Sequence, residues 1–168
     1  MQRRLILIVG GGILILSIVL IIAMTAVFVP EAEPQYDVAV RFVKAAATGD
    51  EVTAFALLAP ELQDAVRENC PDGSASGCIQ SYPPPEWGDF LNVVFRRSRP
   101  VGDGTWDVLL IATYEDDQGY SGICIYTHTA QDESGEWRVQ RWSGFVSCDL
   151  PDAGLDGLAA DGAPNQMP

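Results

Sequence analysis

A long apolar segment near the N-terminus constrains this chain more than any other feature. Residues 5–29 contain no charged side chain and are almost wholly aliphatic. As a helix, a segment of this length rises about 37 Å, which covers a hydrocarbon core of roughly 30 Å with some tilt. Arg3 and Arg4 precede it. The positive-inside rule therefore predicts a single-pass membrane helix, with residues 1–4 as a cytoplasmic stub and the rest of the chain extracytoplasmic.

The same segment does not fit a cleaved signal peptide. The apolar region of a signal peptide has about 7 to 15 residues and ends at a small-x-small site. The best cut, after Ala26, places the bulky Met24 where a small residue is needed. We therefore expect an uncleaved signal-anchor that holds the protein in the cell membrane. The span contains no ionisable residue, which argues against an ion pathway through it.

Charge separates the N-terminal segment from the rest of the chain. Two of the ten basic residues precede the apolar segment, and the other eight follow it together with all 23 acidic residues. The remainder of the chain therefore carries a formal charge of −15. A field of this sign repels nucleic acid, which is excluded as a partner. The partners that remain are the lipid bilayer, contacted through residues 5–29, and an envelope protein or a small ligand.

Helical periodicity begins after a short proline-containing linker at residues 30–34. Apolar residues in the segment 36–48 follow the i, i+3, i+4, i+7 spacing of one buried helix face. Gly49 suits the end of this helix, and Asp50 suits the N-cap of a second helix that reaches Leu58. The segment from Pro60 to Asn69 predicts a third helix.

The period then changes from 3.6 to 2. Residues 70–78 are a loop by composition, and four strands follow, rich in β-branched and aromatic residues. We place the strands at 90–99, 105–114, 120–130 and 137–146. Their short connections require antiparallel pairing in a meander. The sequence thus predicts an α+β domain over residues 35–149, in which helices pack on a curved four-stranded antiparallel sheet. An acidic tail at residues 150–168 lacks the apolar content to form a core, and we expect it to be disordered.

Two sequence motifs carry a family resemblance. The segment Ala-Leu-Leu-Ala-Pro-Glu-Leu at 56–62 follows a helix, a Gly-Asp break and a second helix, and Gly-Glu-Trp-Arg-Val at 135–139 closes the meander. Over residues 35–147 this pattern resembles the nuclear transport factor 2-like superfamily, and most closely its poorly characterised membrane-anchored bacterial members. The resemblance implies a cone, in which helices close a bent sheet around a pocket. This architecture hosts isomerases, cyclases, dehydratases and non-catalytic binding modules, so it implies no single chemistry.

Four cysteines in an extracytoplasmic domain predict two disulfides, formed among Cys70, Cys78, Cys124 and Cys148. Three pairings are open. The simplest joins Cys70 to Cys78 across a short Gly/Ser loop, which leaves Cys124 and Cys148 to pair with each other.

This second pair raises a geometric difficulty. If Ala130 faces Glu136 across the last hairpin, Cys124 lies opposite Trp142. Cys148 is then six positions further along the strand, about 20 Å away, whereas a disulfide needs Cα atoms within about 7 Å. Either the chain reverses near Gly144, or the helix-side cysteines pair with the strand-side ones. No cysteine pair has the spacing of a structural zinc site, so we predict no metal and no cofactor.

Candidate site residues come from the strands. His128, the one histidine, shares a strand face with Tyr126, and a histidine can serve as a general base near neutral pH. Asp107 and Arg141 also lie within strands, where an inward carboxylate is costly unless it is paired. Because both faces of the Asp107 strand are apolar, alternation does not decide which way this carboxylate points. These four residues form the candidate pocket set.

The remaining basic cluster, at 96, 97 and 99, is interpreted as protection of a sheet edge or as partners for the many acids. No recognisable catalytic, phosphate-binding or metal-binding motif occurs in the sequence. The leading hypothesis is therefore a membrane-anchored extracytoplasmic binding or assembly module without catalytic activity. One alternative is an isomerase, cyclase or dehydratase type of enzyme that uses a pocket carboxylate. Another is a small accessory subunit of a membrane complex.

A non-reducing peptide map of the full-length protein from membranes tests the anchor and the compartment together. We expect an intact N-terminal segment 1–29 and four bonded cysteines, because the segment is too long for signal cleavage and the domain lies in an oxidising space. Free thiols throughout would instead place the domain in a reducing compartment and reverse the predicted topology.

Overall fold

The computed structural model describes residues 15, 17–20, 33–116, 123–147 and 166–167. The chain divides into two units, residues 1–32 and 33–168. In the first unit, the described residues are helical and exposed, and the rest of the predicted membrane segment lies outside the described residues. Across the parts of the chain that the structure describes, no helix is both long enough and apolar enough to cross a bilayer.

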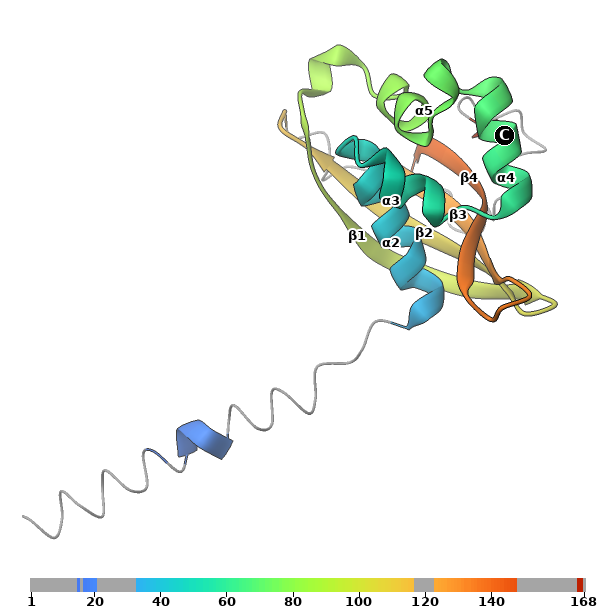
Figure 1. Ribbon diagram of the computed structural model, residues 1–168. Helices are drawn as coiled ribbons and strands as arrows, with labels where there is room; N and C mark the ends of the chain where they lie inside the picture. The colour runs from blue at the N-terminus through green and yellow to red at the C-terminus, as the bar shows by residue number, and fades with distance from the viewer. Residues whose placement is uncertain (1–14, 16, 21–32, 117–122, 148–165, 168) are drawn as a thin grey trace, which may run out of the picture. The chain divides into compact units, whose positions relative to one another are not determined.

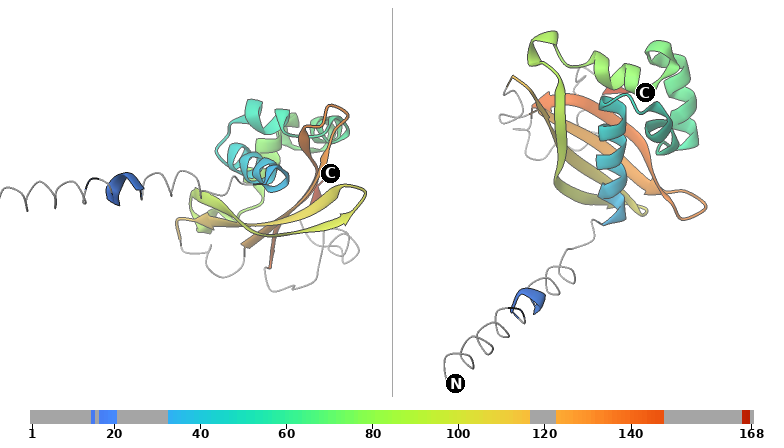
Figure 2. Two further views of the ribbon diagram at one scale, coloured as in Figure 1. Left: turned by 90° about the horizontal axis from the view of Figure 1, so that it is seen from below. Right: turned by 60° about the vertical axis from the view of Figure 1, so that its left-hand side comes forward.

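Four long strands form the antiparallel meander that the sequence predicts. They are β1 (Phe90–Gly102), β2 (Thr105–Tyr114), β3 (Ile123–Gln131) and β4 (Trp137–Ser147). A short fifth strand, β5 (Gln166–Met167), pairs with β4, so the strand order is β1-β2-β3-β4-β5. The predicted disordered tail thus contributes two residues to the sheet, and its other residues lie outside the described part of the chain. The sheet is strongly twisted and curves around the helices (Figure 2).

Helices cover one face of this sheet (Figures 1 and 2). They are α2 (Pro34–Ala47), α3 (Glu51–Ala56), α4 (Pro60–Asn69) and α5 (Ala75–Ser81). The predicted break between the first two is confirmed: Gly49 has φ +79°, and the Asp50 carboxylate accepts a hydrogen bond from the Thr53 backbone N–H.

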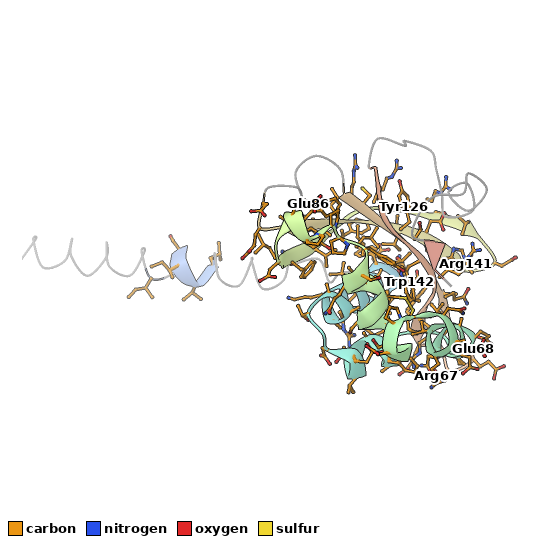
Figure 3. All side chains as sticks on the ribbon, turned by 90° about the horizontal axis from the view of Figure 1, so that it is seen from above. Arg67, Glu68, Glu86, Tyr126, Arg141 and Trp142 are labelled. Carbon is orange, nitrogen blue, oxygen red and sulfur yellow. A yellow bond between two sulfur atoms is a disulfide. The ribbon has the colours of Figure 1, made fainter. Side chains whose placement is uncertain are left out.

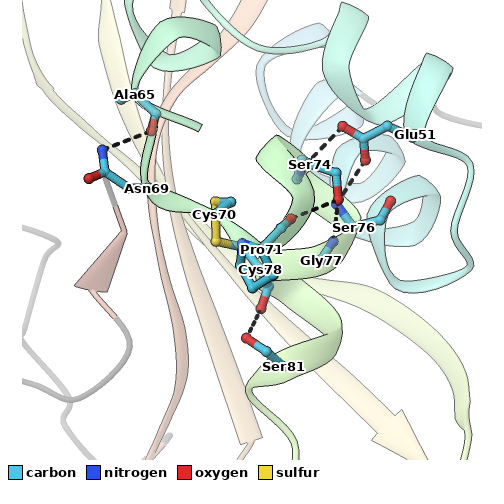
Figure 4. The surroundings of a disulfide bond; sticks show 11 residues. Glu51, Ala65, Asn69, Cys70, Pro71, Ser74, Ser76, Gly77, Cys78 and Ser81 are labelled. Carbon is cyan, nitrogen blue, oxygen red and sulfur yellow. Dashed lines mark hydrogen bonds between the residues drawn. A yellow bond between two sulfur atoms is a disulfide. The ribbon is translucent and has the colours of Figure 1, made fainter. Parts of the chain in front are cut away.

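Helix α5 was not expected, because composition predicted a loop at residues 70–78. Its start is fixed by hydrogen bonds that the local sequence does not show (Figure 4). The Ser74 hydroxyl accepts from the Gly77 N–H at 2.8 Å. The carboxylate of Glu51, on α3, accepts from the N–H groups of Ala75 and Ser76 at 3.0 and 2.9 Å. A distant acid thus satisfies donors that are otherwise unpaired at a helix start.

The three cysteines that the structure describes are bonded, and the strand register removes the difficulty with the second pair. Cys70 and Cys78 form a disulfide, and Cys124 is disulfide-bonded as well. Cys148 lies outside the described residues. The predicted register is wrong, because Cys124 lies opposite Val146 instead of Trp142. The hairpin loop is longer than we assumed and the β3–β4 pairing contains two register shifts. Only two sequence positions therefore separate Val146 from Cys148.

The core lies between the helices and the concave face of the sheet. At its centre, the ring of Phe42 on α2 packs against Trp142 on β4, with ring centroids 5.0 Å apart, and both side chains are fully buried. At one end of α2, Tyr36 stacks on Phe95 of β1 at 4.3 Å. Aromatic side chains thus fill the centre of the space between the helices and the sheet, and a hollow of about 330 Å³ remains at one end, where Ala47, Ile79, Phe90 and Tyr114 are among its lining residues.

Replacing Trp142 by alanine should lower the free energy of unfolding by about 3–5 kcal/mol, because it empties the largest fully buried position. The measurement is urea unfolding of the full-length protein under non-reducing conditions. Val52→Ala, at a side chain that is 84% exposed, is the matched control and should change stability by less than about 0.5 kcal/mol. Equal effects of the two variants would contradict this description of the core.

Candidate functional site

The two faces of the sheet differ in chemistry. Val108 and Leu110 of β2 point toward the helices and belong to the core. Asp107, which alternates with them, therefore points away from the helices, onto what we call the outer face. Trp142 of β4 lies on the helix-facing side, whereas Tyr126 of β3 lies on the outer face (Figure 3).

Four ionisable residues form one row across the outer face. Arg99 of β1 pairs with Asp107, Asp107 pairs with His128 of β3, and His128 pairs with Arg141 of β4. Cross-strand neighbours have Cβ atoms about 5 Å apart, so each side chain lies within reach of the next. Three of the four predicted site residues thus share this row, and Arg99 joins it from the cluster that we interpreted as edge protection.

Asp107 is the centre of the row. Its Oδ1 lies 3.0 Å from His128 Nδ1, and its Oδ2 accepts from Arg99 Nη2 at 3.3 Å. Only 7% of the residue is exposed. Burial raises the pKa of Asp107, but the hydrogen bonds and charges of His128 and Arg99 outweigh it, and the net pKa is lowered. The carboxylate is therefore charged at neutral pH and orients the imidazole.

This contact determines how His128 presents its ring. Because Nδ1 faces the Asp107 carboxylate, we assign a proton to Nδ1, which donates it to that hydrogen bond. The other ring nitrogen, Nε2, is then left to contact a ligand. A carboxylate–imidazole pair of this kind can hold a ligand through Nε2 or move a proton there. The His128 side chain is 15% exposed, so it is accessible at the surface of the sheet.

A groove of about 520 Å³ begins at the His128 end of the row. It is lined by residues from β3, β4 and the first turn of α4, namely Ala59, Glu61, Leu62, His128, Gln140 and Arg141. A neighbouring hollow of similar volume shares Ala59, Glu61 and Gln140 with it, and extends past Asp132 and Arg138.

The groove lies in a gap along the edge of β4. On one side, residues 57–59 pair with Val139. The Ala59 N–H donates to the Val139 carbonyl, and the Val139 N–H donates to the Leu57 carbonyl, both at 2.9 Å. On the other side, β5 pairs with Trp142 and Ser143. The intervening Gln140 is an extra residue, because the register shifts between His128–Arg141 and Thr129–Val139.

The outcome for the sequence-predicted residues is mixed. Asp107 and His128 are in direct contact, and His128 and Arg141 line the same groove. Tyr126 lies one row away, with 2% exposure, and does not line the groove. Glu61 and Gln140 were missed. The Ala-Pro-Glu motif at 59–61 predicted the start of α4 but carried no sign that the helix start faces the sheet edge.

No protein-family model, curated protein or solved structure matches this chain. The nuclear transport factor 2-like resemblance therefore stays a prediction from the sequence. Within residues 33–116 and 123–147, no three His, Cys, Asp or Glu side chains gather in a way that could hold a metal ion.

The lowered pKa of Asp107 predicts a specific pH dependence. A depressed carboxyl pKa adds stability above the ordinary value of 3.8, and this stability is lost as the pH falls through the folded-state pKa. Asp107→Asn should lower the free energy of unfolding at pH 7 by on the order of 1–3 kcal/mol. The difference between wild type and variant should shrink as the pH drops from 5 toward the folded-state pKa, in urea unfolding followed by circular dichroism.

Asp64→Asn is the matched control for this experiment. Asp64 pairs with Arg67 at 2.6 Å, but its side chain is 75% exposed, so its loss should cost less than about 1 kcal/mol. Parallel pH profiles of wild type and Asp107→Asn would show that the buried carboxylate does not contribute its pairing energy to the fold.

Proposed function

We propose that this protein is a membrane-anchored extracytoplasmic binding module, and that its ligand site is the groove beside the start of α4. The observation that carries the proposal is the oriented Asp107–His128 pair at the end of that groove, next to the guanidinium group of Arg141. Ligand sites are concave and hold a small number of positioned polar groups among apolar ones. Leu62 and Ala59 provide the apolar part of this lining.

The cellular setting follows from the first unit and the cysteines. The uncharged segment 5–29 has the length and flanking charges of a single-pass anchor with a cytoplasmic N-terminus. The Cys70–Cys78 disulfide supports an oxidising compartment for the domain. A helix layer on a bent antiparallel meander is also the arrangement that the nuclear transport factor 2-like resemblance implies. The groove then lies in the cell envelope, where it faces an envelope protein or a small ligand.

A second function is favoured by the same contact. In enzymes, a carboxylate often orients the histidine that acts as a general base, and Asp107 contacts His128 in this way. Because His128 lines the groove, the groove is also suited to proton transfer on a bound substrate. An isomerase, cyclase or dehydratase type of reaction needs such a base. We rank this second because Phe42 and Trp142 fill the centre of the helix-facing side, where the resemblance places such chemistry.

Photocrosslinking in the native membrane tests the binding role for a ligand of any identity. A benzoylphenylalanine probe replaces Gln140, an exposed residue of the groove lining, in the full-length protein. We expect one discrete adduct, with a small molecule or with an envelope protein, because a probe at position 140 contacts whatever binds in the groove. Val52, 84% exposed on α3 and outside the groove lining, carries the probe in the control.

Each outcome of the crosslinking distinguishes between the functions. The same adducts from both positions, or none from the groove, would contradict a binding role for this site. If a small-molecule adduct forms, incubation of that molecule with wild type and His128→Gln follows. Its recovery unchanged supports the binding module, and conversion that depends on His128 supports the enzyme. A stoichiometric protein adduct would favour the accessory subunit.

A further inference from the structure

Two buried hydroxyl groups on the outer face, one row from the groove lining, have no hydrogen-bond partner among the described residues. Tyr126 Oη and Ser143 Oγ make no hydrogen bond within the described part of the chain, and each residue is only 2% exposed. They are direct cross-strand partners on β3 and β4. A buried hydroxyl without a partner costs about 1–3 kcal/mol, and in native proteins it marks a place where a water, an ion or a ligand group supplies the missing bond.

The hydroxyl pair is part of a larger arrangement. Tyr126 is two residues from His128 along β3, and Ser143 is two residues from Arg141 along β4. Residues two apart on a strand share a face and are about 6.6 Å apart. All four side chains therefore lie on the outer face in a two-by-two block, with the hydroxyls in one row and the ionisable groups in the next.

The chemistry of this block selects its ligand. Two hydroxyls, a guanidinium group and an imidazole are all able to donate hydrogen bonds, and an oxyanion can accept several of them at once. Asp107, the carboxylate beside the block, already accepts from His128 and Arg99. The carboxylate of Glu61 lines the same groove as His128 and Arg141, and it disfavours a ligand with several negative charges.

We propose that the Tyr126–Ser143–His128–Arg141 block binds a single oxyanion group, a carboxylate or a phosphate, of a small molecule that occupies the groove. This inference rests on the proposed binding function and names the class of its ligand. The hydroxyls take the inner oxygen atoms, and Arg141 and His128, which reach the groove, take the outer ones.

Thermal unfolding of the full-length protein in detergent tests the oxyanion site. The probes are sodium phosphate and sodium acetate at pH 7, each compared with sodium chloride at equal ionic strength. For wild type we expect a saturable rise in Tm, on the order of 5 °C near saturation, since a ligand that binds the folded state alone stabilises it. A response to phosphate alone or to acetate alone identifies which group the site takes.

The variants Tyr126→Phe and Ser143→Ala separate binding from folding. Each removes an unpartnered hydroxyl, so the Tm in chloride should stay the same or rise, while the anion-dependent rise is lost. Thr129→Val is the matched control, because Thr129 Oγ1 is also buried without a partner, but its strand neighbours Trp106 and Val139 belong to the helix-facing side. This variant should keep the full anion response, which also corrects for general salt effects on stability.

Two results would overturn the proposal. One is an equal anion response in wild type, Tyr126→Phe and Ser143→Ala. The other is a clear loss of Tm in chloride for both hydroxyl variants, which would show that these hydroxyls have structural partners. The two experiments can fail independently. A crosslinked adduct at position 140 without an anion-dependent rise in Tm would support the binding function and contradict only the proposal that the ligand carries an oxyanion.

Discussion

The packing of α2 into the curved sheet determines where polar chemistry can lie in this domain. Phe42 and Trp142 meet at the centre of that contact, where both side chains are fully buried. A charged group on that side would lose its hydration without a partner, at a cost of several kcal/mol. The charged pair of Arg99 and Asp107, with His128, is therefore found on the outer face, where Asp107 is paired on two sides. The centre of the helix-facing side thus serves folding, and the binding surface that we propose lies on the other side of the sheet.

The strands and the helix break were predictable from local patterns, whereas the site was predictable only in part. The alternation of side chains predicted a strand at 105–114, which are the bounds of β2 in the structure. The Gly49–Asp50 pair predicted the end of one helix and the N-cap of the next. Alternation could not orient Asp107, because Val108 and Leu109 on its two faces are equally apolar. The deciding information is tertiary, namely which face of the sheet α2 covers. Helix α5 was missed for a similar reason, since the acid that fixes its start, Glu51, is more than twenty residues away.

Long-range and short-range electrostatics oppose each other at this surface. The chain after residue 29 carries a formal charge of −15, and that field resists the approach of any anion. Arg99 and Arg141 act only over the few ångströms in which they contact a ligand, because salt screens exposed charges beyond about 10 Å. The recognition that we propose on this face therefore depends on close geometric fit.

The extra residue in β4 has a consequence for how this chain can change its length. Val139 and Trp142 both face the core although they are three positions apart, an odd number that is incompatible with simple alternation. Gln140 absorbs the difference. Deleting Gln140 would put Val139 and Trp142 two positions apart, so simple alternation would keep both in the core and leave Arg141 on the outer face. The face that a side chain occupies here is therefore encoded by the count of residues along the strand, and at Gln140 this count can fall by one without exchanging interior for surface.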